Sequence, residues 1–167
     1  VSTYPGDVLT VLKAIEFTRS GDVIVIDGRG YKDGAIWGDM TSRTAVRRGV
    51  VGVVIDGAVR DVKYIIQMKF PVFARAIAPN NGSMEYLGKI NMPIQCGGVT
   101  VKAGDIVFGD DDGVVVIPKE RAEEVLKTAQ SITQEEKEMA SKIEGGLSIG
   151  QILEVDKIIE KKEKKGN

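Results

Sequence analysis

The sequence predicts a mixed α/β fold. Runs of aliphatic and β-branched residues of strand length alternate with amphipathic segments of helical periodicity, which is the pattern of strands and helices packed in layers. With 167 residues, 43% of them hydrophobic and only 5% aromatic, the chain is long enough for one core of aliphatic side chains. Glycine-containing turns punctuate these runs. We therefore expect a single α/β domain followed by C-terminal helices.

The first half of the chain predicts three helices and three strands. Asp7 follows the Pro5-Gly6 turn and can cap the first helix. Runs rich in valine and isoleucine predict buried strands, and the segments between them carry apolar residues at helical spacing. We expect, in order, a helix that follows Asp7 and ends at Ser20-Gly21, a strand over 22–27, a helix over 39–48, a strand over 50–56, a helix over 62–69 and a strand over 70–75.

The second half begins with short strands and ends in helices. Pro118 opens a long helix over about residues 119–143, and Gly145-Gly146 breaks it. We expect one domain over residues 1–145 and a helical tail over residues 146–167. Because the first four residues read as the end of a strand, we also expect a segment to precede Val1. The short strands are expected at residues 94–95, 99–101, 106–108 and 113–117.

Charge and composition exclude several classes of function. Lys and Arg number 23 and Asp and Glu 24, a formal net charge of −1, so we expect no nucleic-acid partner and no anionic membrane surface. No apolar run approaches the 18 to 20 residues of a membrane helix. The single cysteine, Cys96, excludes an internal disulfide, and its apolar setting favours packing over reactivity. We expect a cytoplasmic protein.

The chain contains no histidine. This excludes a Ser-His-Asp or Cys-His relay within the chain, an imidazole base and a histidine zinc site. Carboxylates, lysine, arginine, backbone groups and bound metal remain as possible catalytic groups. Because the available metal ligands are oxygens, they favour Mg²⁺ or Mn²⁺.

The stretch from Trp37 to Asp61 carries two polar corners, Gly38-Asp39 and Arg60-Asp61. A helix over residues 39–48 would travel roughly 15 Å away from the first corner. A strand over residues 50–56 would return roughly 20 Å, so the two corners should meet at one edge of the fold. A divalent cation and an anion could bind there, provided that the carboxylates of Asp39 and Asp61 lie within about 10 Å of one another.

Three other patterns have alternative interpretations. The segment Gly28–Gly34 has the spacing G-x-G-x-x-x-G, which departs from the dinucleotide-binding pattern and favours a loop at the rim of a pocket. The acidic run at residues 110–112 lacks the spacing of a calcium loop and favours a turn between strands. A Schiff-base mechanism on Lys13 or Lys63 is a third alternative, although neither lysine lies in an apolar sequence context.

Five motifs occur together in a fixed order. They are Trp37-Gly38-Asp39, Asp56-Gly57-Ala58-Val59-Arg60-Asp61, Phe70-Pro71-Val72-Phe73-Ala74, Cys96-Gly97-Gly98 and Gly109-Asp110-Asp111-Asp112-Gly113-Val114. This set resembles the RraA-like family, which includes the 4-hydroxy-4-methyl-2-oxoglutarate/4-carboxy-4-hydroxy-2-oxoadipate aldolases. The resemblance covers about residues 3–145. It implies a β/β/α swivelling-type fold and a homotrimer or dimer of trimers with active sites between subunits.

The same resemblance implies roles for individual residues. Aldolases of the family are similar in an Asp-x20-Arg-Asp pattern, which Asp39, Arg60 and Asp61 match. By this resemblance Asp61 would bind the divalent metal, Asp39 would reach it through a water molecule, and Arg60 would contact a bound pyruvate unit. Substrate binding would also involve Gly38 and the backbone N–H groups of Met40 and Thr41 at the start of a helix.

A carboxylate from a neighbouring subunit would complete such a site, with Glu135, Glu136 and Glu138 as candidates and Glu136 as our choice. The implied activity is metal-dependent cleavage of small 2-oxo acids, either 4-hydroxy-4-methyl-2-oxoglutarate or, by decarboxylation, oxaloacetate, through a pyruvate enolate. The alternative is a non-catalytic regulator that binds another protein, as the inhibitor of ribonuclease E does. That inhibitor departs from the aldolase pattern at the first aspartate, which this chain retains as Asp39.

Overall fold

The structure is a computed structural model that describes residues 1–164. The chain divides into two compact units, Val1–Lys119 and Glu120–Asn167, whereas the sequence predicted a boundary after residue 145. The first unit contains α1 (Leu9–Ile15), β1 (Val23–Trp37), α2 (Asp39–Arg47), β2 (Gly52–Val59), α3 (Val62–Gln67), β3 (Val72–Ile77), β4 (Ile94–Cys96), β5 (Val99–Val101), β6 (Ile106–Asp110) and β7 (Gly113–Ile117).

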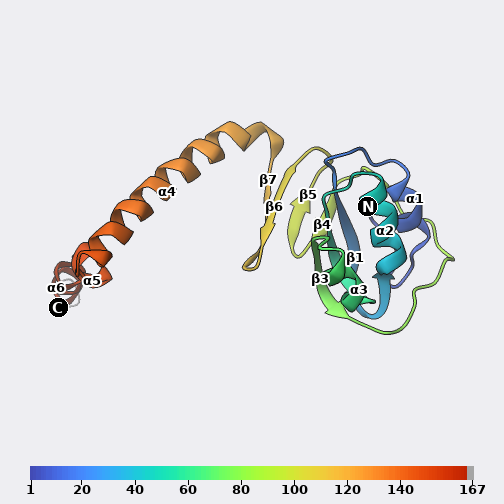
Figure 1. Cartoon of the computed structure of the whole chain (residues 1–167), viewed down its shortest axis with the longest axis horizontal. Coiled ribbons are helices and arrows are strands. Elements are labelled where there is room, and N and C mark those ends of the chain that lie inside the picture. The colour runs from blue at the N-terminus through green and yellow to red at the C-terminus, as the bar shows by residue number, and fades with distance from the viewer. Residues whose placement is uncertain (165–167) are drawn as a thin grey trace. The chain divides into compact units, whose positions relative to one another are not determined.

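A parallel sheet in the order β1-β2-β3 forms the centre of the first unit (Figure 1). Its strands are rich in valine and isoleucine, as expected for strands that are covered on both faces. The β1–β2 pairing begins at Val23 opposite Gly52 and ends at Trp37 opposite Val59. The carboxyl ends of these two strands therefore lie next to each other.

The glycine-rich segment after residue 27 is part of β1, and its prediction as a rim loop was wrong. The pairing with β2 shifts register three times, between Asp27 and Tyr31, between Tyr31 and Ala35, and between Ala35 and Trp37. Arg29 and Gly30 adopt positive φ angles of 56° and 69°, which are typical of bulged strands. The sequence suggested a loop because glycines interrupt the apolar pattern. In the structure these glycines allow the strand to bulge and then continue.

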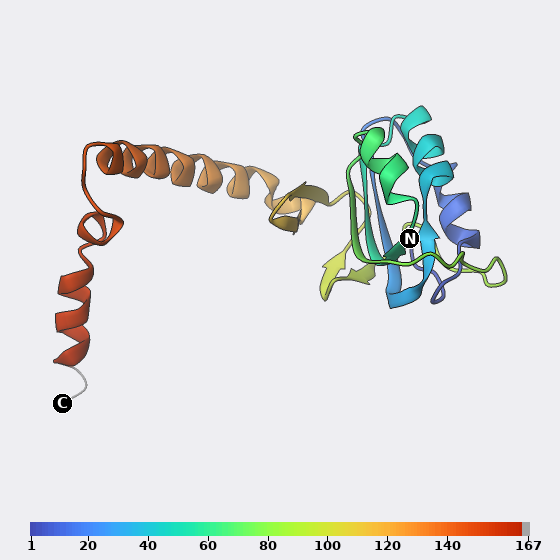
Figure 2. The ribbon, with the colours of Figure 1, turned by 60° about the horizontal axis from the view of Figure 1, so that its bottom comes forward.

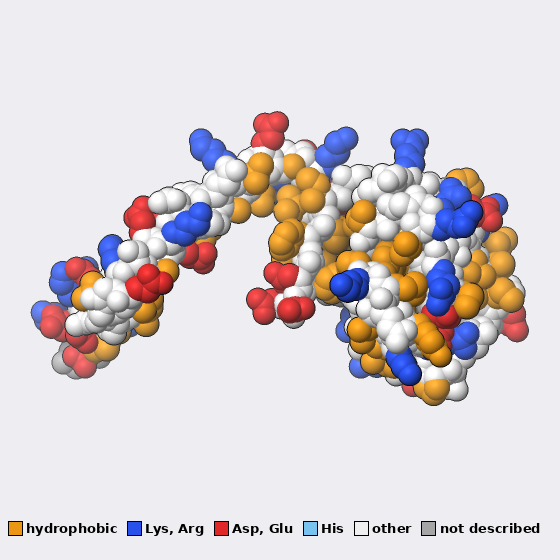
Figure 3. Space-filling model, viewed as in Figure 1, with side chains coloured by type: hydrophobic (Ala, Val, Ile, Leu, Met, Phe, Trp, Pro, Cys, Tyr) orange, Lys and Arg blue, Asp and Glu red, His pale blue; other side chains and the backbone are white. Residues whose placement is uncertain are grey.

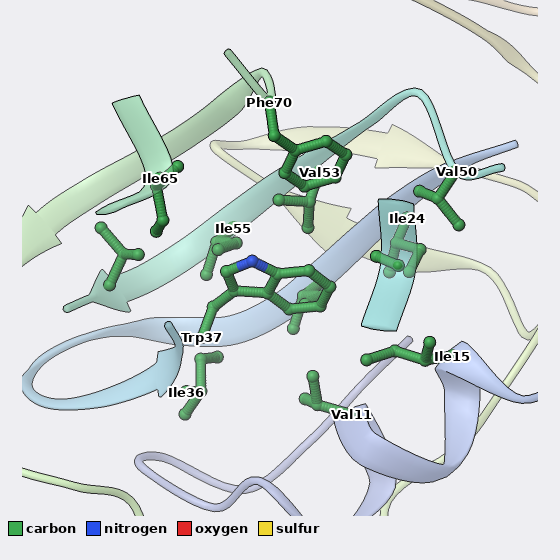
Figure 4. Packing of buried hydrophobic residues seen from close by; sticks show 13 residues of the cluster. Val11, Ile15, Ile24, Ile36, Trp37, Val50, Val53, Ile55, Ile65 and Phe70 are labelled. Carbon is green, nitrogen blue, oxygen red and sulfur yellow. The ribbon is translucent and has the colours of Figure 1, made fainter. Parts of the chain in front are cut away.

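Helices α1, α2 and α3 cover one face of the sheet (Figures 1 and 2). Trp37, with 2% of its surface exposed, lies at the centre of the core that they enclose (Figure 4). Burial of each large aliphatic side chain in such a core stabilises the fold by roughly 1.5–3 kcal/mol. The helices contribute Val11, Ile15, Ala45 and Ile65 to this core, and the strands contribute Ile24, Ile26, Ile36, Val53 and Ile55.

The hairpin of β4 and β5 packs against β1, and its turn is fixed to β2 by Asp56. Asp56 precedes the end of β2 and points away from the helical face, because its neighbour Ile55 is in the core. Its carboxylate pairs with Arg75 of β3 and accepts a hydrogen bond from the backbone N–H of Gly97 at 2.8 Å. The helices, the parallel sheet and this hairpin give the β/β/α layering that the family resemblance implied.

Asp7 connects the start of α1 to a loop that is distant in the sequence. Its side chain is fully buried and accepts hydrogen bonds from the N–H of Leu9, the hydroxyl of Ser83 and the N–H groups of Glu85 and Tyr86. Burial alone would raise the pKa of Asp7, but these hydrogen bonds outweigh burial and hold the pKa below its ordinary value. One carboxylate thus fixes the loop after β3 to the first helix.

The second unit is helical and consists of α4 (Ala122–Glu144), α5 (Ile149–Ile152) and α6 (Val155–Glu163), preceded by a short 3₁₀ turn. Charged side chains of both signs lie along α4, and none of its residues is buried (Figure 3). Gly146, at φ 96°, ends α4 in a Schellman motif in which Leu147 N–H donates to Lys142 O at 3.1 Å.

The predicted tail over residues 146–167 forms α5 and α6 within the described part, and its last three residues lie outside the described residues. Ser148 caps α5, because its hydroxyl accepts from Gln151 N–H at 3.2 Å while the Gln151 side chain accepts from Ser148 N–H. Across residues 1–164, no helix has both the length and the apolar character needed to cross a bilayer.

We expect Asp7→Asn to lower the free energy of unfolding by about 1.5–3 kcal/mol, because an amide cannot accept all four hydrogen bonds. The native pKa is depressed, so the stabilisation by the wild-type carboxylate is present above the unfolded pKa of about 4 and is lost as pH falls through the native pKa. Urea unfolding at several pH values measures both effects. Asp111→Asn, at an exposed position, is the control, and equal stability of the two variants at pH 7 would contradict the role of Asp7.

Candidate functional site

The two polar corners of the sequence meet at the carboxyl ends of β1 and β2. Beyond the last pair, Trp37 and Val59, the ladder continues with a hydrogen bond from Arg60 N–H to Trp37 O at 3.0 Å. The N–H of Asp39 then donates to the Oδ2 atom of Asp61 at 3.3 Å. The two corners are therefore adjacent, as the lengths of the predicted helix and strand indicated.

Asp61 has an unusual backbone that directs its carboxylate toward the first corner. It precedes α3 in the left-handed conformation, with φ 59° and ψ 30°, which is uncommon for a residue other than glycine. Its Oδ2 atom lies 3.4 Å from the Nε atom of Arg60. Gly38 leaves room for this carboxylate, since a Cβ atom on Gly38 would lie 2.7 Å from Asp61 Oδ2.

The start of α2 is held by a chain of side-chain hydrogen bonds. The indole N–H of Trp37 donates to the hydroxyl of Ser42 at 2.8 Å, and that hydroxyl donates to Gly38 O at 2.8 Å. Thr41 bonds to both backbone groups of Gly38 through its hydroxyl. The N–H groups of Met40 and Thr41 lie in the first turn, where a helix offers them no carbonyl of its own. They are therefore suited to receive an anion.

A cavity of about 200 Å³ opens between these corners. All the site residues that the sequence predicted within the first unit line it. They are Gly38, Asp39, Met40, Thr41, Arg60 and Asp61.

Five further residues of the cavity come from the region of α1 and from the loop after β3. Two belong to the start of α1 and three to the loop that Asp7 anchors. The turn chemistry of residues 78–83 indicated a loop, but no local signal placed it near Asp39. These residues are Val8, Leu12, Asn81, Gly82 and Met84.

The two carboxylates satisfy the distance condition for one hydrated cation. Because the carboxylate oxygens of an aspartate lie within about 5 Å of its own backbone nitrogen, those of Asp39 and Asp61 are at most about 8 Å apart. Within residues 1–164, no three Cys, Asp or Glu side chains are grouped closely enough to hold a metal ion by themselves. Two carboxylates nevertheless fit Mg²⁺, which binds through one or two carboxylates and keeps several waters.

Asp39 is partly shielded by a second arginine. The Nε atom of Arg43, one turn along α2, lies 3.6 Å from Asp39 Oδ2. The Asp39 side chain is 17% exposed and that of Asp61 is 31% exposed, so both carboxylates remain open to a ligand. Because exposed ion pairs contribute little to stability, we interpret Arg43 as tuning the orientation of Asp39 rather than as a structural bridge.

Glu136 lies on α4 in the second unit and has an exposed side chain. Its assignment to the site of a neighbouring subunit stays a prediction.

The alternative patterns have structural explanations. Asp110 accepts a hydrogen bond from Asp112 N–H at 3.0 Å in the turn between β6 and β7, as the turn interpretation predicted.

Cys96 is half-buried. Burial and the nearby Asp56 carboxylate raise the pKa of its thiol, which disfavours reactivity. Lys13 pairs with Glu16 at the surface, and Lys63 is exposed. Neither lysine is desolvated as a Schiff-base mechanism requires.

A larger cavity of about 640 Å³ lies at the opposite end of the sheet, where β1 begins. Its lining includes Val23, Val51 and Ile94, and it contains none of the predicted site residues. We assign the candidate site to the smaller cavity, because ligand sites of open parallel sheets lie at the carboxyl ends of the strands.

The fold and this site define a β/β/α domain with a cavity lined by carboxylates and arginine at the carboxyl ends of two parallel strands. The chain belongs to the RraA-like family, whose model, described as Aldolase/RraA, matches residues 1–116. The matched segment contains both polar corners and the loop that Asp7 anchors.

Relatives at 40% identity or above cover most of this chain. An uncharacterized protein of Methanocaldococcus jannaschii is 40% identical over 148 residues, which are 88% of this chain and 71% of that protein. A protein of Halalkalibacterium halodurans named "Putative 4-hydroxy-4-methyl-2-oxoglutarate aldolase" is 44% identical over 130 residues, which are 78% of this chain and 62% of that protein. The chain thus spans about two thirds of the length of these relatives.

Solved structures agree with the fold. A crystal structure of an uncharacterized protein from Pseudomonas syringae superposes with a TM-score of 0.76 at 32% identity, covering 82% of this chain and 69% of that chain. The RNA-processing inhibitor RraA from Thermus thermophilus superposes with a TM-score of 0.65 at 31% identity, covering 70% and 71%. Proteins named as an aldolase and as an inhibitor are therefore both similar to this chain.

We expect Ser42→Ala to destabilise the protein by about 1–3 kcal/mol, because it leaves the buried indole N–H of Trp37 without its acceptor. Trp37 is the only tryptophan of the chain, so its fluorescence reports urea unfolding directly. The control is Thr44→Ala, which removes an exposed hydroxyl from the same helix and should change stability by a few tenths of a kcal/mol. Equal midpoints for the two variants would show that the Trp37–Ser42 bond does not stabilise the start of α2.

Proposed function

We propose that the protein is a divalent-metal-dependent aldolase and decarboxylase that cleaves small 2-oxo acids through a pyruvate enolate. One observation carries the proposal: Asp39, Arg60, Asp61 and the first turn of α2 line a single cavity. Arg60 and the first turn of α2 can bind the carboxylate of a substrate, and the side chains of Asp39 and Asp61 can bind a cation. The similarity to a protein named as an aldolase supports the same reading.

The 2-oxo acid would bind with its carboxylate at the first turn of α2. There the N–H groups of Met40 and Thr41 offer hydrogen bonds, and the helix dipole favours negative charge. The planar guanidinium of Arg60 can donate two parallel hydrogen bonds, which matches the adjacent carboxylate and keto oxygens of a 2-oxo acid. The substrate is thereby oriented with the bond to be broken away from α2.

Asp61 would hold the divalent cation, and Asp39 would bind it through water. When bound, Mg²⁺ or Mn²⁺ supplies Lewis-acid polarisation of the 2-keto group. The hard carboxylate oxygens of the two aspartates suit either ion, and the histidine-free chain disfavours zinc.

Arg60 would stabilise the transition state, because negative charge grows on the keto oxygen that it contacts as the carbon–carbon bond breaks. Asp39 would orient a water molecule that takes the proton of the substrate hydroxyl in the aldol reaction. Decarboxylation of oxaloacetate passes through the same enolate and needs no such base. One arrangement of residues therefore accounts for both reactions.

A regulatory protein without activity is the second candidate, and the similarity to the Thermus thermophilus inhibitor favours it. Asp39 argues for the enzyme, because a protein that only docks on a partner needs no carboxylate within an anion-binding cavity. Turnover assays separate the two.

We also infer a homotrimer or a dimer of trimers, in which Glu136 of a neighbouring copy completes the ligand set. The inference is compatible with the cavity, because its two carboxylates leave coordination positions of a cation that either waters or a third carboxylate could occupy. Sedimentation of the native protein and of Glu136→Gln would show whether assembly depends on that residue, and turnover assays of the same two proteins would show whether activity does.

We expect release of pyruvate from oxaloacetate and from 4-hydroxy-4-methyl-2-oxoglutarate in the presence of Mg²⁺ or Mn²⁺, and its loss with excess EDTA. Asp61→Asn should lose about 10²-fold or more in kcat/KM, because an amide is a weak ligand for a hard cation. A coupled lactate dehydrogenase assay measures pyruvate. No turnover of either substrate would contradict the enzyme, and EDTA-resistant activity trapped by borohydride would favour a lysine mechanism.

We expect Arg60→Lys to reduce kcat/KM by about 10²–10³-fold, because a point charge cannot replace the fork of two donors that faces the developing enolate. Arg47→Lys, an exposed change on α2 outside the cavity, is the matched control and should retain wild-type activity. If Arg60→Lys stays within threefold of wild type, Arg60 does not stabilise the transition state.

A further inference from the structure

The cavity has two chemically different parts. Its charged residues, Asp39, Arg60 and Asp61, belong to the meeting of the two corners. The part formed by α1 and the anchored loop contains Val8, Leu12 and Met84, which we call the apolar wall. The apolar wall carries no charge, and the neighbouring Asn81 adds only a neutral amide.

The apolar wall is fixed to the fold. Val8 N–H donates to Ser83 O and Ser83 N–H donates to Gly6 O, both at 2.8 Å, while the buried carboxylate of Asp7 binds the same loop. Gly82 packs so closely that a Cβ atom would lie 2.8 Å from Val8 Cγ1 and 2.5 Å from Gly6 O. The apolar character of this part therefore belongs to a preformed surface.

The arginines near the cavity belong to its charged part. Arg60 lines the cavity beside Asp61, and Arg43, which lies outside the lining, is 3.6 Å from Asp39 Oδ2. A second carboxylate placed against the apolar wall would meet no cation on that wall, and an unpaired charge near apolar surface is costly.

We propose that the site selects 2-oxo acids whose fourth carbon carries an uncharged, apolar substituent in preference to dicarboxylates, and that Leu12 and Val8 determine this specificity. This inference rests on the proposed function. In the reaction, the C3–C4 bond of a 4-hydroxy-2-oxo acid breaks and the hydroxyl proton passes to the base. The C4 oxygen becomes a carbonyl, and the electron pair of the broken bond forms the pyruvate enolate, which takes up one proton at C3. The leaving product is then a neutral aldehyde or ketone.

Binding of two unreactive probes tests the preference without turnover. 2-Oxopentanoate and 2-oxoglutarate differ only by a methyl group in place of a carboxylate at the end of the chain, and neither has the hydroxyl needed for cleavage. We expect 2-oxopentanoate to bind about tenfold or more tightly to the full chain with Mg²⁺, in titrations followed by Trp37 fluorescence, because Trp37 lines the cavity. Equal affinity, or tighter binding of 2-oxoglutarate, would overturn the inference.

A charge introduced at the apolar wall should reverse the preference. Leu12 is 39% exposed on α1, so Leu12→Arg can be accommodated and should improve binding of 2-oxoglutarate relative to 2-oxopentanoate by about tenfold. Val46→Arg, at a position on α2 that is 47% exposed and outside the cavity, adds the same charge and should leave the ratio unchanged. An equal change in both variants would mean that net charge, and not the apolar wall, sets the preference, which would overturn the inference.

Turnover separates this inference from the proposed function. The matched substrates are 4-hydroxy-4-methyl-2-oxopentanoate, which yields pyruvate and acetone, and 4-hydroxy-4-methyl-2-oxoglutarate, which yields two molecules of pyruvate. We expect the first to have the higher kcat/KM. Cleavage of both with a preference for the dicarboxylate would overturn only the inference. Cleavage of neither would overturn the proposed function, and the binding ratio of the two probes would still decide whether the cavity selects an uncharged substituent.

Discussion

The parallel pairing of β1 with β2 is the constraint on which the candidate site depends. The pairs Val23–Gly52 and Trp37–Val59 mark its two ends, so fourteen steps along β1 correspond to seven along β2. The bulged glycine-rich segment absorbs the excess, and without it β1 would extend far beyond the end of β2. The bulges thus allow Gly38-Asp39 to meet Arg60-Asp61, and the last register shift, between Ala35 and Trp37, lies at the cavity itself.

A second constraint, the buried carboxylate of Asp7, connects stability to the shape of the site. Its hydrogen bonds join α1 to a loop more than seventy residues away in the sequence. The same loop carries Asn81, Gly82 and Met84 into the cavity. Because the carboxylate is buried and satisfied by several donors, the loop is held without packing of its largely exposed side chains. The apolar half of the cavity is therefore as well fixed as the charged half.

Local sequence patterns predicted the features that depend on residues close together in the sequence. The apolar periodicity located most helices and strands, and the lengths of α2 and β2 were enough to bring Asp39 close to Asp61, because a helix and a returning strand have fixed rises. The bulged course of β1 was not predicted, since it depends on pairing with a partner strand. Leu12 and Asn81 were missed for a similar reason: they reach the cavity through contacts of long sequence separation, which periodicity does not encode. The role assigned to Glu136 stays a prediction, because it would need a second copy of the chain.

Family membership leaves two classes of function open, because one fold can present different sites. Whether the protein is an enzyme or a regulator then depends on a few groups at the end of β1. An anion-binding first turn of α2 and an arginine would suffice for a protein that only recognises acidic groups. The two carboxylates within about 8 Å of one another add repulsion for an anion, and this is a cost unless a cation is bound between them and the ligand. The presence of both Asp39 and Asp61 in an open cavity therefore favours the proposed cation-dependent chemistry over anion recognition alone.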